Sequence, residues 1–249
     1  MTEHHHTHDT GKLTVRDLVK GYPATGLGRK KIPVLQGLSF DLLPGEILGI
    51  TGPSGMGKTT LARLLLRVTA ADSGKIRFDG NNVLTLKGKN LAAYRQRVKA
   101  ITQHPESALN PRFTIAESLR EVFRPQGKKA LAQATPETLR RMLDDVGLQA
   151  ACLTRLPRQL SGGELQRVVI ARTMATRPAL IIADEPTSNL DVITRARMAD
   201  LLTAQCRKHG AGMLLISHDT ALVSALCHRV ITLPKSPQKP ASGGKVRAP

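Results

Sequence analysis

The sequence is poor in aromatic residues, with four Phe, two Tyr and no Trp among 249 residues. Proteins that bind single-stranded nucleic acid stack bases on aromatic side chains, so this shortage argues against that class. Acidic residues are also few: 19 Asp and Glu stand against 37 Lys and Arg, a formal net charge of +18. That charge would suit a nucleic acid, an anionic membrane surface or a nucleotide, or belong to a merely solvated basic surface. Charge alone does not choose among these classes.

Paired cysteines and long apolar runs are absent as well. Cys152, Cys206 and Cys227 lie far apart without C-x-x-C spacing, so neither a disulfide framework nor a zinc ribbon is indicated. No run approaches the ~18 apolar residues of a membrane span. The polar N-terminus has no apolar core of a signal peptide, so we expect a cytosolic protein. The hydrophobic content of 41% is enough to fill the core of one large α/β domain or two small ones.

One segment matches a phosphate-binding loop, G-x-x-x-x-G-K-[ST]; it reads Gly52-Pro53-Ser54-Gly55-Met56-Gly57-Lys58-Thr59-Thr60. A short buried strand is expected before it, over Glu46 to Thr51, and a helix after it, over Leu61 to Val68, with Val68 on the apolar face. The glycines would let backbone N–H groups curl around a phosphate. Lys58 would add positive charge, Thr59 a hydroxyl for Mg²⁺, and the helix N-terminus its dipole. The flanking elements favour this interpretation over a glycine-rich turn.

Two carboxylates end a second apolar run. Leu180 to Ala183 leads into Asp184 and Glu185, which places both acids at the carboxyl end of a buried strand, where open α/β sheets bind ligands. Asp184 can hold Mg²⁺ through water, and Glu185 can orient or deprotonate an attacking water. Such a string is common by chance, but much less so beside a phosphate loop.

The string from Leu160 to Arg167 reads LSGGELQR and begins a helix. Ser161 is a good N-cap, and Gly162 and Gly163 leave the first-turn N–H groups bare, so this helix offers a second anion site. The structural alternative is a capping box between Ser161 and Glu164. Both interpretations can hold together, because a capped helix end keeps its dipole.

Strands that alternate with helices along the chain imply a mainly parallel sheet. Further strands are expected over residues 13–19, 34–43, 75–78, 99–102, 179–183, 212–217 and 230–233, and helices over 91–97, 163–175, 192–209 and 220–226. Residues 104–160 contain only helical patterns, over 114–124 and 136–146, joined by a link at 125–135. Residues 1–11, with His4, His5, His6 and His8, are expected to be disordered, as is the basic tail 234–249. We favour a chance His tract over a working metal site.

Over about residues 12–233 the chain resembles the nucleotide-binding subunits of ATP-binding-cassette (ABC) transporters. The phosphate loop, Gln103, Leu160 to Glu164, Asp184-Glu185, Ser188 to Asp191 and His218 follow that family's order, and the LSGGE string makes the resemblance specific. It implies an α/β fold with a P-loop NTPase (RecA-like) core on a mainly parallel sheet, an antiparallel β subdomain, and a helical subdomain at about 104–160. It also implies an ATPase that uses ATP and Mg²⁺.

The resemblance assigns roles to individual residues. Tyr22 looks like the residue that stacks on adenine, and Gln103 looks like the residue that links the metal and the attacking water to the helical subdomain. Asp191 looks like a contact across the subunit interface, and His218 looks like the switch that senses the γ-phosphate. Together with Lys58 and Glu185, Gln103 and His218 form the implied catalytic set; Thr59, Gln103 and Asp184 form the implied metal set. Seen alone, a packed Tyr and a helix-capping His would be favoured.

By the same resemblance, two cassettes pair head to tail, so that the phosphate loop of one and Ser161 to Gly163 of the other enclose each ATP. The second cassette is the same chain or a paralogue. The implied partners are membrane permease subunits and, indirectly, an extracytoplasmic solute-binding protein, with no nucleic acid. The chain would then be peripheral, at the cytoplasmic face of the inner or plasma membrane.

The solute is indicated by the segment after Gln103, where Ser107, Asn110, Pro111 and Arg112 resemble the oligopeptide, dipeptide and nickel importer branch. Asn189 in Ser188 to Asp191 looks closer to the nickel members. Peptide-type members generally have a long C-terminal extension with clustered cysteines, whereas here few residues follow His218 and Cys227 stands alone. We therefore favour nickel or a related metal complex over peptides. Val230 to Leu233 runs into Pro234-Lys235 rather than the family's usual Gly-containing turn.

Two other classes compete with the importer. A soluble ABC ATPase acting on DNA or ribosomes would suit the net charge of +18, but Lys58 and Ser161 are only 103 residues apart, too close for a long coiled coil between them, and the chain holds one cassette. A metal-binding accessory protein built on the His tract would leave the ATPase motifs without a role.

Overall fold

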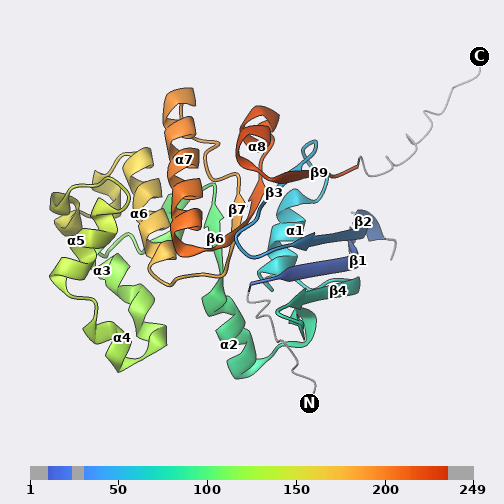
Figure 1. The fold of residues 1–249 in the computed structure, drawn as a ribbon, viewed down its shortest axis with the longest axis horizontal. Helices are drawn as coiled ribbons and strands as arrows, with labels where there is room; N and C mark the ends of the chain where they lie inside the picture. The colour runs from blue at the N-terminus through green and yellow to red at the C-terminus, as the bar shows by residue number, and fades with distance from the viewer. Residues whose placement is uncertain (1–10, 24–30, 235–249) are drawn as a thin grey trace, which may run out of the picture.

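The computed structural model describes residues 11–23 and 31–234. Figure 1 shows a central sheet covered by helices, an antiparallel sheet to one side and a group of short helices at the opposite end. The predictions for His4, His5, His6 and His8 and for residues 235–249 lie outside the described residues. None of the helices in the described part of the chain combines the length and apolarity needed to cross a bilayer.

The central sheet is parallel, with strand order β6-β7-β8-β3-β9. Its strands are β3 (Ile47–Thr51), β6 (Val98–Thr102), β7 (Leu180–Asp184), β8 (Gly212–Ile216) and β9 (Arg229–Thr232). Every residue of β3 and β8 is buried, because helices cover both faces of the sheet. This arrangement confirms the predicted mainly parallel core.

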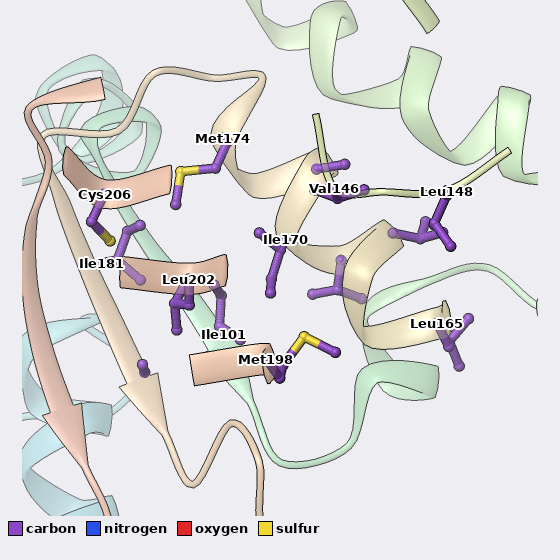
Figure 2. Packing of buried hydrophobic residues seen from close by; sticks show 14 of the residues in the cluster. Ile101, Val146, Leu148, Leu165, Ile170, Met174, Ile181, Met198, Leu202 and Cys206 are labelled. Atoms are coloured by element: carbon purple, nitrogen blue, oxygen red, sulfur yellow. The ribbon is translucent and has the colours of Figure 1, made fainter. Parts of the chain in front are cut away.

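Alternate residues of the central strands enter two different cores. Ile181 of β7 packs with α6 (Gly162–Met174) and α7 (Val192–His209), where Figure 2 shows the cluster that also contains Ile170 and Leu202. Its neighbours Leu180 and Ile182 pack on the other side, against α1 (Lys58–Leu65). The period of two follows from strand geometry, so one strand anchors both layers.

The second sheet is antiparallel, as expected for the β subdomain, in the order β2-β1-β4-β5. Its strands are β1 (Leu13–Pro23), β2 (Lys31–Leu42), β4 (Ser73–Phe78) and the short β5 (Asn81–Asn82). Buried residues of this sheet share one core with α1, so the phosphate-loop helix lies between the two sheets. A single-turn helix over Val83–Thr85 and α2 (Gly88–Arg97) then return the chain to β6.

Between β6 and α6 the described chain is helical. It contains α3 (Ile115–Arg120), α4 (Lys128–Ala132) and α5 (Pro136–Asp144), with 3₁₀ turns at Pro105–Ala108, Glu121–Gln126, Ala150–Thr154 and Pro157–Gln159. Figure 1 shows α3, α4 and α5 together at one end of the molecule. The predicted helical subdomain is present, and α8 (Thr220–Leu226) completes the covering of the central sheet.

Three local predictions were wrong. Val68 is not on the buried face of α1: the helix ends at Leu65, Arg67 adopts a left-handed φ of 55°, and Val68 is 70% exposed. The link at 125–135 contains the helix α4, which contacts the preceding 3₁₀ turn. The single helix predicted over residues 114–124 is divided, because α3 ends at Arg120 and the chain tightens into a 3₁₀ turn that contains Pro125.

Candidate active site

The carboxyl ends of the parallel strands meet at one edge of the sheet and bring the predicted site residues together. Chain segments leave this edge from β3 into the phosphate loop, from β7 at Asp184, from β8 towards His218, and from β6 towards Gln103. Residues that are far apart in sequence therefore become neighbours.

The phosphate loop has the backbone that its glycines suggested. Gly55 and Gly57 have φ values of 81° and 87°, in the left-handed region that side chains disfavour. A Cβ atom at Gly57 would also lie 2.8 Å from the Val34 Cγ1 and Leu35 Cδ2 atoms of β2. At Gly55 the space is open, so only its backbone conformation requires glycine.

Lys58 occupies the floor of this loop and is only 9% exposed. Its Nζ donates hydrogen bonds to the carbonyl oxygens of Gly52, at 2.6 Å, and Pro53, at 3.0 Å. A cavity of about 380 Å³ adjoins it and is lined by Val34, Ser54, Gly55, Gly57, Lys58, Thr59, Thr60, Asp184 and Glu185. The structure therefore joins the loop and the two acids around one space.

Asp184, the last residue of β7, lies in that cavity with a hydrogen bond from Thr59. Burial raises the pKa of Asp184, against the lowering effects of Thr59, Lys58 and Arg63. Its Oδ1 atom is buried and has no hydrogen-bond partner among the described residues. A carboxylate and a hydroxyl at a phosphate loop fit Mg²⁺, which takes oxygen ligands from one or two side chains together with phosphates.

Glu185 follows Asp184 with a φ of 51°, an unusual backbone conformation for a residue with a side chain. Its carboxylate accepts a hydrogen bond from the His218 backbone N–H at 3.0 Å, and the imidazole Nδ1 lies 2.9 Å from each oxygen. The Ser217 hydroxyl is 3.4 Å from Oε2. The second acid is therefore held by the end of β8.

Gln103 lies in a neighbouring cavity of about 480 Å³, which Thr59, Asp184 and Glu185 also line. Its side-chain Nε2 donates to Asn189 Oδ1 at 3.3 Å, and Asn189 Nδ2 donates to the Gln103 carbonyl oxygen at the same distance. Gln103 is thus placed beside the two acids, and its amide is held by the segment that follows them.

The predicted nucleotide contacts that do not line the cavity at the phosphate loop are Tyr22, Gly52, Pro53, Met56, Ser161, Gly162, Gly163 and Asp191. Tyr22, in β1, is 36% exposed, and its ring centroid lies 5.4 Å from Lys20 Nζ. Ser161 forms the capping box: Glu164 Oε2 accepts from its N–H and Oγ at 2.8 Å, and Glu164 N donates to Oγ at 3.3 Å. Asp191 caps α7 through the N–H of Thr194, a contact that lowers the pKa of Asp191.

Several residues of this region were not foreseen. Val34 lines the cavity from β2, Ser217 contacts Glu185, and Arg195 lies close to both the 188–191 turn and the residue after His218. Of these residues, only Ser217 had a signal in the sequence, because it directly precedes His218. Val34 and Arg195 reach the site through tertiary structure alone.

Comparison with known proteins places these features in a family. Residues 35–188 match the family described as ABC transporter. A putative peptide import ATP-binding protein of Brucella ovis is 40% identical over 90% of this chain and 70% of its own length. The nickel import ATP-binding protein NikE of Pseudomonas putida is also 40% identical, over 89% of this chain and 81% of its own length.

Solved structures agree with the fold. The dimeric structure of MJ0796, described as a bacterial ABC transporter cassette, superposes with a TM-score of 0.76 at 26% identity, over 89% of this chain and 94% of that one. A second dimeric structure of the same cassette, in a post-hydrolysis state with ADP and Pi, has a TM-score of 0.75 at 25% identity.

Proposed function

This chain belongs to the ABC transporter family and is one of its ATPases, and from that premise we propose that it energises a solute importer by hydrolysing ATP at the Lys58 cavity. The observation that carries the proposal is the cavity itself, which Lys58, Thr59, Asp184 and Glu185 line together. A cation, a hydroxyl and two carboxylates at one phosphate loop form the set that phosphoryl transfer to water needs.

The residues divide the chemistry between them. Loop N–H groups and Lys58 hold the β- and γ-phosphates, where Lys58 exchanges its bonds to the Gly52 and Pro53 carbonyls for bonds to the nucleotide. Thr59 and Asp184 are the proposed holders of Mg²⁺, with Gln103 beside them. Bound Mg²⁺ would neutralise charge that develops on the phosphates.

Glu185 is the proposed base that orients the attacking water. Its contacts with His218 fix the position of the carboxylate. The same histidine, whose side chain is 62% exposed, is the proposed contact to the γ-phosphate. Tyr22 is proposed to stack on adenine from the antiparallel sheet. All three roles follow from the family resemblance. The contacts between Glu185 and His218 support the first two, and the role of Tyr22 rests on the resemblance alone.

For the assembly, we propose a head-to-tail pair in which Ser161 to Gly163 and Asp191 act across the interface. The cassette structures described as dimeric support the formation of a pair, and the head-to-tail arrangement follows from the family resemblance. The importer names of the relatives support permease subunits as partners and an extracytoplasmic binding protein further away, and hence a position at the cytoplasmic face of the membrane. We propose that residues 104–124, which follow Gln103 and begin the helical region, contact the permease; crosslinking from this segment should identify a membrane subunit.

The activity is tested by Lys58→Ala, with the exposed Lys89→Ala as the matched control. We expect the first variant to lose ATPase activity, because the transition state loses its cation, and the control to keep the wild-type rate. Phosphate release by the purified protein measures both. Near wild-type activity of Lys58→Ala would remove the assignment.

A pull-down tests the competing class. If it recovered DNA or ribosomes instead of a permease, with binding that falls steeply as the salt concentration rises, the soluble ABC ATPase would be favoured.

For the solute, we propose nickel or a related metal complex, with peptides as the second candidate. The nickel relative and the resemblance at Asn189 support the first, and the peptide relative supports the second. Deleting the gene should reduce nickel accumulation measured by elemental analysis. Normal accumulation together with lost growth on peptides would overturn this choice.

A further inference from the structure

Arg195, in the first turn of α7, connects two loops of the active-site edge. Its Nη1 atom donates to Asp219 Oδ2 at 3.2 Å, and its Nη2 atom donates to the Leu190 carbonyl oxygen at 3.3 Å. The first partner directly follows His218, and the second lies in the turn that follows Glu185. One guanidinium therefore holds the segments after β7 and β8 at a fixed separation.

Asp219 continues this connection towards Glu185. Its Oδ1 accepts from the Leu222 N–H and caps α8, while its own N–H donates to the Ser217 hydroxyl at 3.1 Å. Ser217, which is 3% exposed, in turn contacts Glu185 Oε2. The path from Arg195 to the carboxylate thus consists of three consecutive polar contacts through Asp219 and Ser217.

The geometry favours a positioning role over an ordinary surface ion pair. The side chains of Arg195 and Asp219 are 26% and 27% exposed, so the pair is largely shielded from solvent. The Nε atom of Arg195 is buried and has no hydrogen-bond partner in the described part of the chain. A buried donor without a partner costs free energy, so the contacts of the two Nη atoms must offset that cost. Arginine can satisfy a carboxylate and a carbonyl together because its donors diverge from one rigid plane.

We propose that Arg195 is a positioning residue for hydrolysis: through Asp219 and Ser217 it sets the carboxylate of Glu185, and through the Leu190 carbonyl it couples that setting to the turn before α7. The inference rests on the proposed role of Glu185 as the group that orients water. Arg195 makes no proposed contact with nucleotide, so replacing Arg195 should change the rate of turnover rather than the affinity for nucleotide.

The test compares Arg195→Ala, Arg195→Lys and Asp219→Asn with Arg197→Ala, an exposed arginine on the same helix. Asn at 219 keeps a capping oxygen for α8 but removes the carboxylate that faces Arg195. We expect kcat for ATP hydrolysis to fall roughly 10- to 100-fold in Arg195→Ala and Asp219→Asn, the scale of a misplaced catalytic group. KM for ATP should stay within about twofold. Arg195→Lys should recover part of the rate, and Arg197→Ala should match wild type.

Coupling to Glu185 is measured in the Glu185→Gln background, where positioning the carboxylate no longer matters. There Arg195→Ala should cause no further fall in rate, whereas a general structural defect would lower it again. Thermal melting of each variant separates misfolding from mispositioning. Wild-type kcat in both Arg195→Ala and Asp219→Asn, or additive losses with Glu185→Gln, would overturn the inference. An unchanged rate in Glu185→Gln alone would instead overturn the proposed function.

Discussion

Replacing Glu185 with Gln separates ATP binding from hydrolysis more cleanly than any other change at this site. Gln keeps the length of the side chain and one oxygen that can accept the His218 N–H, now 3.0 Å from Oε1. The new amide group can donate to the imidazole Nδ1, which lies 2.9 Å from both carboxylate oxygens. The fold and the loop at Lys58 should therefore be unchanged, while the base and its negative charge are lost.

The expected loss follows from what remains. Phosphate binding by the loop, Lys58 and Thr59 is intact, so the variant should bind ATP with wild-type affinity. Hydrolysis should fall by roughly two to four orders of magnitude, the usual contribution of a positioned acid–base group. This corresponds to about 3–5 kcal/mol of activation free energy. Phosphate release gives the rate, and equilibrium ATP binding gives the affinity.

ATP that is bound but not hydrolysed should hold two cassettes together. Size-exclusion chromatography of Glu185→Gln with and without Mg-ATP should therefore show a nucleotide-dependent dimer. Adding Ser161→Arg should block it by filling the opposing face, whereas Ser161→Ala, which removes the cap without adding bulk, should still dimerise. A monomer in Mg-ATP, or equal dimerisation of the Ser161→Arg variant, would refute the two-chain site for this protein acting with itself. A heterodimer with a paralogue would then be tested by co-expression.

Three further changes test single features. Tyr22→Ala should weaken ATP binding by about 1–3 kcal/mol if the ring stacks on the base, measured by titration calorimetry; an unchanged affinity would make Tyr22 a surface residue only. Asp184→Asn should abolish Mg²⁺-dependent hydrolysis but raise the Tm at neutral pH. Burial raises the pKa of Asp184, so its charged form destabilises the fold, and the Tm gain should shrink as pH falls and the wild-type carboxyl takes up its proton. Equal Tm values at all pH values would contradict that reasoning. Gly57→Ala should lower both Tm and ATP binding, because its Cβ would lie 2.8 Å from Val34 and Leu35 atoms and its φ is 87°; wild-type behaviour in melting and binding assays would show that the loop relaxes freely.

Elements with strong local signals were predictable from the sequence. The predicted bounds of α7 and α8 match the structure, since Asp191 and Asp219 cap their starts and Gly210 ends α7 in a left-handed conformation. The apolar strands β7 and β8 were equally clear because helices bury both faces. The helix α4 was missed because it has five residues, no side-chain cap and no buried residue. Its existence depends on contact with the 3₁₀ turn before it.

At the site, the sequence indicated which residues come to one edge but not how they pair. Asn189 illustrates this limit: the sequence marked it as a sign of the solute class, and the structure gives it a reciprocal contact with Gln103, 86 residues away. Ser217 and Glu185, 32 residues apart, meet for the same reason. The register between β6 and β7 brings the first pair together, and the register between β7 and β8 brings the second. One sequence contains no signal for either register beyond the strands themselves.

Under the proposed function, one copy of the chain would give an incomplete site. Ser161 to Gly163 begin α6 with exposed or half-exposed backbone, yet none of them lines the cavity at Lys58. Under the proposed function, an anion site at that helix start would act on nucleotide that a second cassette binds. Val192 and Ile193, directly after Asp191, are 77% and 66% exposed, so covering them in an interface would remove apolar surface from water. A second cassette that covers Val192 and Ile193 would also contact the turn at Asp191. Through the Leu190 carbonyl oxygen, which Arg195 contacts, this turn is connected to Glu185.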